Sequence, residues 1–215
     1  MHTMTIVRKT RNPRTRPAPT LLLAALLALA GCATGEPKPE TRADGGAAPA
    51  VELGEATRVD ADVRADFDKA LALLQAGNIE PGMELLTRVS ERAPNSTAPY
   101  INLAIAQQDL GKFEAAEENL KKALAIAPEH PVANNEYGIL YRRTGRFAEA
   151  RKTYESVLKK DAAFLPARRN LAILCDLYLK DYDCALENYE KYRDANRGDQ
   201  AVEIWIADVK ARAGR

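Results

Sequence analysis

The amino-acid sequence predicts an all-α protein: an α-α solenoid, or superhelix, of about four helix-turn-helix repeats closed by a C-terminal capping helix. Three observations predict it. Gly77, Gly111 and Gly145 are separated by 34 residues at each step. Pro94 and Pro128 are separated by the same 34 residues. Between these markers, apolar residues recur three or four positions apart, which is the spacing of an amphipathic helix in a repeat protein.

Residues 1–31 are predicted to be a signal peptide that is cleaved. The stretch Met1–Arg16 is basic, and leucines between Leu21 and Leu29 form an apolar run that stops at Gly31. The run is shorter than the roughly 20 apolar residues that span a bilayer, and it fits the 7–15-residue apolar segment of a secretory signal.

The end of this leader, Leu29-Ala30-Gly31-Cys32, resembles the lipobox of bacterial lipoproteins. The resemblance implies that Cys32 receives diacylglycerol and a further acyl chain such as palmitate, and several chains anchor a protein stably. Ala33 stands where that family's inner-membrane retention signal has Asp, so the resemblance implies an anchor in the outer membrane, facing the periplasm. The alternative is an ordinary signal peptide cut after Ala30, with Cys32 unmodified.

Charge separates this leader from the rest of the chain. The whole chain has 31 Lys and Arg against 30 Asp and Glu, a net charge of +1. The leader contains five of the basic residues and no acid, so the mature chain is acidic. We therefore expect no nucleic-acid partner, because nucleic-acid-binding domains carry a strongly basic face.

Residues 32–57 are predicted to form the lipidated cysteine and a disordered tether. They are rich in Pro, Gly, Ala and alternating charge, and contain almost nothing large enough to bury. A flexible chain of this length reaches roughly 25–30 Å.

Residues 58–199 are predicted to hold four repeats, at 63–96, 97–130, 131–164 and 165–199. Small residues recur where the two helices of each repeat face each other, which lets the helices cross closely. They are Ala70, Ala104, Gly138 and Ala172 on the first helices, and Gly82, Ala116, Ala150 and Ala185 on the second. The glycines that end the first helices adopt the left-handed conformation without a Cβ clash. Phe113 and Phe147, two residues later, are predicted to pack under the turn.

The outer repeats depart from this pattern. The first has Lys69 where an apolar residue is expected, and the fourth has an extra residue around Leu179-Lys180 and no turn glycine. Residues 200–215 are predicted to form the capping helix. Its apolar face consists of Val202, Trp205, Ile206 and Val209.

The repeat pattern resembles the tetratricopeptide-repeat (TPR) family over about residues 63–199. The resemblance implies a concave groove, lined by the first helices, that binds a protein or peptide segment. Transferred position by position, the groove residues are Ile101, Asn102, Ile105, Gln108, Asn135, Ile139, Arg142, Arg143, Arg169, Asn170, Ile173 and Asp176. We expect the amides to hold a peptide backbone and the arginines to bind a carboxylate. The alternative is a solvated spacer that binds nothing.

No catalytic motif accompanies the repeats. The sequence contains no HExxH, CxxC, GxSxG or phosphate-binding glycine loop. These absences predict a protein that is not an enzyme and has no metal, cofactor or small-molecule substrate.

Two cysteines of the fourth repeat, Cys175 and Cys184, are predicted to form a disulfide. The leader directs them to an oxidising compartment, and they flank the turn between two antiparallel helices. Two buried free thiols, or a redox-active pair, are the alternatives.

Taken together, the lipobox and the repeats resemble TPR lipoproteins that serve machines of the bacterial envelope. We expect a scaffold or assembly factor, attached to the membrane through its lipid anchor, for a pilus or secretin, for outer-membrane protein assembly or for a TonB-type system. Two alternatives remain open: a self-associating structural lipoprotein without a specific peptide ligand, and a recruiter of peptidoglycan enzymes.

Overall fold

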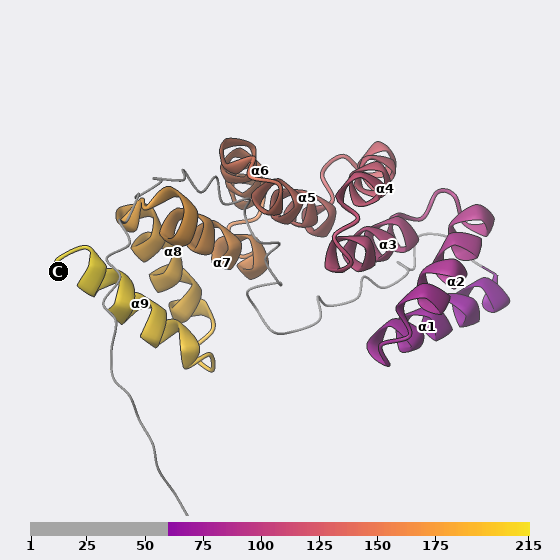
Figure 1. Cartoon of the computed structure of the whole chain (residues 1–215), viewed down its shortest axis with the longest axis horizontal. Helices are drawn as coiled ribbons and strands as arrows, with labels where there is room; N and C mark the ends of the chain where they lie inside the picture. Colours follow the sequence, from indigo (N-terminus) through magenta and orange to yellow (C-terminus); the bar gives the residue numbers. More distant parts are fainter. Residues whose placement is uncertain (1–59) are drawn as a thin grey trace, which may run out of the picture. The chain divides into compact units, whose positions relative to one another are not determined.

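The computed structural model describes residues 60–215, and all regular structure in this part of the chain is helical (Figure 1). The all-α prediction is therefore confirmed. The predicted signal peptide, the Cys32 lipidation site and the tether lie outside the described residues. No helix within residues 60–215 has both the length and the hydropathy needed to cross a bilayer.

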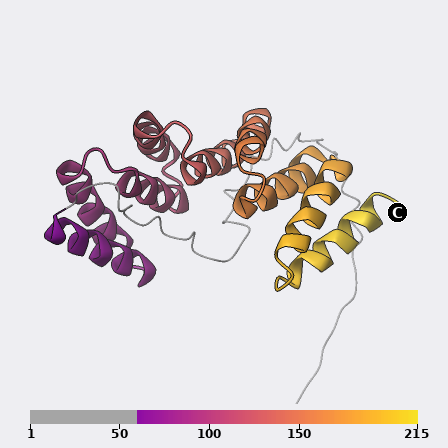
Figure 2. The ribbon, with the colours of Figure 1, turned by 180° about the vertical axis from the view of Figure 1, so that it is seen from behind.

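Within residues 60–215 the helices pair into four hairpins, which follow one another in a row (Figures 1 and 2). They are α1 (Ala61–Gln75) with α2 (Ile79–Arg92), α3 (Thr97–Asp109) with α4 (Phe113–Ile126), α5 (Pro131–Arg143) with α6 (Phe147–Lys160), and α7 (Leu165–Ile173), extended by the π-helical segment η1 (Leu174–Leu179), with α8 (Tyr182–Ala195). The last helix is α9 (Ala201–Arg212). Each helix contacts the next one along the chain, and α3, α5 and α7 also contact one another in order.

Glycine is required where the first helices of the inner hairpins end. Gly111 and Gly145 have φ angles of +71° and +77°. The backbone N–H groups of Lys112 and Arg146, the next residues, donate to carbonyl oxygens five residues back, at 2.8 and 2.7 Å. This is the left-handed helix stop that the repeated glycines predict.

The fourth hairpin reaches the same stop differently. Its extra residue is accommodated by η1, whose helical turn is one residue wider than an α-helical turn. Lys180 then takes the left-handed conformation with φ of 55°, which costs a residue with a Cβ roughly 1–2 kcal/mol. The N–H of Asp181 donates to the carbonyl of Cys175, six residues back, at 2.9 Å.

Close helix crossing shapes the core of the hairpins. The predicted small residues Ala104, Ala116, Ala150 and Ala172 are fully buried. At Gly138 a Cβ would overlap the ring of Tyr154, which is itself completely buried. The largest apolar cluster runs without interruption from α5 through α9. The two helices of each hairpin thus bury their apolar stripes against each other and against the following hairpin.

Gly138→Ala is expected to destabilise the protein by about 1–3 kcal/mol, because the added methyl group forces Tyr154 from its place in a close-packed core. The measurement is chemical denaturation monitored by circular dichroism. Gly198→Ala is the matched control, since nothing lies within 4 Å of a Cβ at that position. If Gly138→Ala and Gly198→Ala had the same free energy of unfolding, the close approach of α5 and α6 at Gly138 would be contradicted.

His130 caps the start of α5. Its Nδ1 accepts the backbone N–H of Ala133 at 3.3 Å, and this requires the neutral imidazole. Burial disfavours the charged ring and lowers the pKa of His130 below its ordinary value of 6.5. Protonation would remove the acceptor and place a positive charge at a helix N-terminus, where the helix dipole disfavours it.

The free energy of unfolding should therefore fall as the pH drops through the lowered pKa of His130, since the unfolded chain binds this proton more readily. Between pH 7.5 and 5.5 we expect a loss of about 1 kcal/mol, the usual value of an N-cap bond. His130→Asn retains a capping acceptor that does not titrate, so it serves as the control. If the free energy of unfolding depended on pH identically in the native protein and the His130→Asn variant, His130 would not contribute to that dependence.

Candidate functional site

The twelve predicted groove residues all lie on the first helices of three neighbouring hairpins. Those on α3 are Ile101, Asn102, Ile105 and Gln108; those on α5 are Asn135, Ile139, Arg142 and Arg143; those on α7 and η1 are Arg169, Asn170, Ile173 and Asp176. Arg143 and Arg169 are half-buried, and the other ten are buried. We call this set the first-helix face. Whether it binds a peptide stays a prediction.

Amide side chains on this face join one hairpin to the next. Asn170 Nδ2 on α7 donates to Asn135 Oδ1 on α5 at 2.9 Å. Gln108 Nε2 on α3 lies 3.5 Å from both the backbone oxygen and Oε2 of Glu136 on α5. The sequence analysis did not select Glu136, which is buried. A signal was available, because Glu136 occupies the same repeat position as Asn102 and Asn170.

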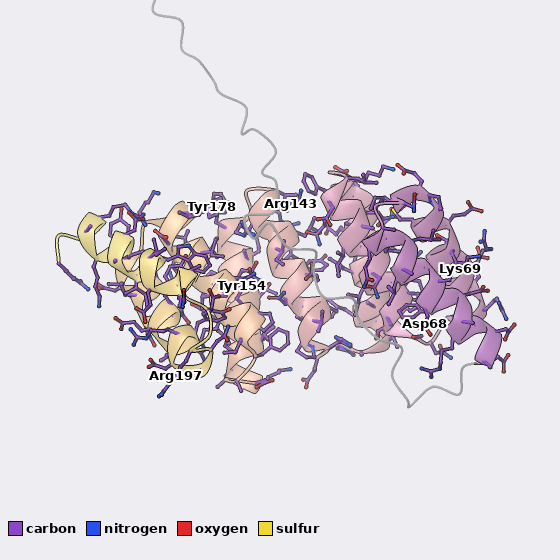
Figure 3. All side chains as sticks on the ribbon, turned by 90° about the horizontal axis from the view of Figure 1, so that it is seen from below. Asp68, Lys69, Arg143, Tyr154, Tyr178 and Arg197 are labelled. Carbon is purple, nitrogen blue, oxygen red and sulfur yellow. A yellow bond between two sulfur atoms is a disulfide. The ribbon has the colours of Figure 1, made fainter. Side chains whose placement is uncertain are left out.

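The arginines on this face contact side chains of the neighbouring hairpins. Arg142 Nη1 donates to the hydroxyl of Tyr178 on η1 at 3.1 Å. The Arg143 guanidinium lies 5.0 Å from the centre of the Phe113 ring and 3.8 Å from the carboxylate of Asp109. Arg143 and Tyr178 lie along the same edge of the row of helices (Figure 3). The predicted carboxylate-binding arginines of α5 are thus held by contacts within the chain.

A recurring aromatic contact runs along this edge. The Phe113 ring is covered by Arg143 from the next hairpin. Phe147 lies 5.0 Å from the ring of Tyr178, and the guanidinium of Arg212 on α9 lies 5.5 Å from the ring of Tyr182. Each of these aromatic residues at a turn therefore contacts a side chain of the following first helix or, at the end of the array, of α9. The two cation–π contacts, Arg143 with Phe113 and Arg212 with Tyr182, contribute about 0.5–1 kcal/mol each where solvent reaches them.

Asp176 connects η1 to the last helix. Its carboxylate forms a 2.6 Å ion pair with Arg212, and the hydrogen bond with Asp176 is the main cause that raises the pKa of Arg212. Burial, and then the nearby Asp176 charge, raise the pKa of Tyr189, while Arg212 and Arg169 oppose this shift. Arg212 and Tyr189 therefore keep their protons at neutral pH.

The predicted disulfide partners lie together at the turn between η1 and α8. The Cα atoms of Cys175 and Cys184 are 5.9 Å apart, inside the range that a disulfide accepts. Asp181 lies beside them; its carboxylate accepts the N–H of Cys184 at 3.2 Å and pairs with Arg151 at 3.0 Å. These three side chains are also the one group within residues 60–215 that offers three potential metal ligands, but the Arg151 charge opposes a cation there. The disulfide stays a prediction.

Asn170→Ala is expected to lower stability by about 1–3 kcal/mol, because it leaves the buried Asn135 oxygen without its donor. The double variant with Asn135→Ala should lose about 1 kcal/mol less than the sum of the two single losses, which a double-mutant cycle measures. Asn95→Ala, at an exposed turn, is the control. Strict additivity would show that the two amides do not interact.

Comparisons with known proteins agree with this geometry. The sequence model of the family described as "Tetratricopeptide repeat" matches residues 107–172. The Type IV pilus assembly protein PilF of Pseudomonas aeruginosa is 31% identical over 144 residues, which cover 65% of this chain and 56% of that protein. A Probable UDP-N-acetylglucosamine–peptide N-acetylglucosaminyltransferase SPINDLY of Solanum lycopersicum is 34% identical over 86 residues, or 40% of this chain. The chain spans only 9% of the length of that relative.

Solved structures show the same fold. The structure titled "Functional Characterization of Pseudomonas Aeruginosa pilF" superposes with a TM-score of 0.65 at 26% identity, over 70% of this chain and 68% of that chain. A thermophilic TPR protein of Thermus thermophilus superposes with a TM-score of 0.61 at 22% identity, over 69% of this chain and 81% of that chain. Because the second identity is low, that likeness concerns the fold alone.

Proposed function

Because the chain is a tetratricopeptide-repeat protein, a scaffold for protein interactions, we propose that it is an assembly factor for a pilus-type machine of the bacterial envelope. It binds a protein partner on its first-helix face, and it performs no chemistry of its own. Stacked repeats present extended surfaces of this kind to their partners.

The observation that carries this proposal is the extent of the similarity to PilF. It covers 144 residues, more than the length of the four hairpins. The similarity to the tomato transferase covers 86 residues of a protein many times longer, which supports shared repeats and not a shared activity. The assignment to pilus assembly therefore follows the relative whose match covers 65% of this chain.

An extended polypeptide would contact the exposed side chains of the first helices, such as Leu177 on η1, which is 46% exposed. The predicted apolar contacts Ile101 and Ile105 are 0% and 8% exposed and pack with Ala123 and Ala133. The side-chain oxygens of Gln108 and Asn170 are buried as well. These four residues therefore support, from within the array, the surface that we propose for binding.

The lipobox supports an anchor for this scaffold. Acylation of Cys32 would hold the mature chain at the outer membrane, and the 32–57 segment would let the repeats reach partners away from the lipid surface. Cys32→Ser should therefore release the protein from the membrane fraction without unfolding it. Unchanged fractionation would contradict the anchor and leave the binding proposal standing.

In-cell cross-linking tests the binding surface. A photoreactive residue at Leu177, which is 46% exposed and holds the same repeat position as Arg143, should cross-link to a discrete protein. Mass spectrometry should identify that protein as a component of the pilus or secretin machinery. The control position is Glu118, exposed on α4, from which we expect no such product.

Two outcomes would overturn the proposal. A discrete partner captured from Glu118 and not from Leu177 would move the binding surface to the second helices. Normal pili, seen by electron microscopy on cells that lack the gene for this chain, would remove the assignment to pilus assembly.

A further inference from the structure

The turn between η1 and α8 differs from the other turns within hairpins in three linked ways. It follows a π-helical segment, it places Lys180 in the left-handed conformation where the others have glycine, and it is flanked by Cys175 and Cys184. Cys175 is completely buried, and Cys184 is half-buried near the start of α8. The least favourable turn conformation thus lies between the two cysteines.

The same turn positions some of the contacts that hold α9, beside ion pairs such as Lys210 with Glu190 of α8. Asp176, next to Cys175, forms the 2.6 Å ion pair with Arg212 of α9. Arg212 also lies over the ring of Tyr182, the first residue of α8. Within α9, Asp208 also pairs with Arg212. A movement of η1 against α8 would therefore separate the two groups outside α9 that contact Arg212.

Helix α9 is also the least supported helix at this end of the array. It packs on α8 through Val202, Ile206 and Val209, and Trp205 lies 5.6 Å from the ring of Tyr189. In a linear array a terminal element has a neighbour on one side only, so it opens at a lower free energy than the interior.

We propose that the Cys175–Cys184 disulfide is a redox latch that keeps α9 docked on the array. A dithiol reductant opens it in two exchanges. One thiolate attacks a cysteine sulfur, which forms a mixed disulfide and releases the other cysteine as a thiolate. The second thiolate of the reductant then attacks its own sulfur in that mixed disulfide and releases the first cysteine, so two protein thiols and a cyclic disulfide result. Without the covalent link, the turn at Lys180 relaxes, Asp176 moves away from Arg212, and α9 detaches. The inference rests on the predicted disulfide and does not depend on the proposed partner.

The test uses the purified protein before and after dithiothreitol. Trp205 is the only tryptophan in the chain, so its fluorescence reports α9 alone. After reduction, mass spectrometry should detect two additional alkylated cysteines. The fluorescence emission of Trp205 should shift to longer wavelength, and amide hydrogen exchange in α9 should become at least tenfold faster. Exchange in α3 and α4 should not change.

Two variants sharpen the test. Cys175→Ser/Cys184→Ser should show the reduced behaviour with and without reductant. Lys180→Gly should weaken the response of Trp205 to reduction, because glycine adopts the left-handed turn without strain.

Three results would overturn the latch. The first is two free thiols in protein purified without reductant. The second is unchanged exchange in α9 after reduction. The third is an equal increase in exchange from α3 through α9, which would make the bond a general stabiliser and not a latch on one helix.

Discussion

The close crossing of two helices within each hairpin is the constraint on which the rest of this structure depends. Helices of 13 or 14 residues are marginal alone in water, so they persist only when they bury their apolar stripes. Gly138 against the Tyr154 ring shows how little space the crossing leaves. Once the hairpins are closed, their remaining apolar surface packs against the next hairpin, and the cluster from α5 through α9 becomes continuous.

The contacts between hairpins use the surface that we propose for binding. Asn135 with Asn170 and Arg142 with Tyr178 join successive hairpins through first-helix side chains. Stability and recognition therefore share residues. If a substitution on this face weakens partner binding, its effect on folding stability must be measured too before the loss is assigned to a lost contact. Exposed positions such as Leu177 are better suited to this test, because changing them alters binding with less effect on stability than changing a buried residue.

Much of the fold follows from the sequence alone. The 34-residue spacing of Gly111 and Gly145 predicts where the first helices end, since glycine takes the left-handed conformation there without Cβ strain. The extra residue near Lys180 is visible in the sequence, but its accommodation in a π-helical segment depends on the packing of η1 against α8. Repeat positions predict which helices carry the site residues. They do not reveal that Arg143 stacks on Phe113, because that contact depends on the distance between neighbouring hairpins and on side-chain rotamers.

The central claim is that this array holds a protein partner on its first helices. Hydrogen–deuterium exchange on the cross-linked complex, compared with the free protein, tests it most directly. We predict slower exchange in α3, α5 and α7 and unchanged exchange in α4 and α6. Slower exchange confined to α4 and α6 would contradict the claim.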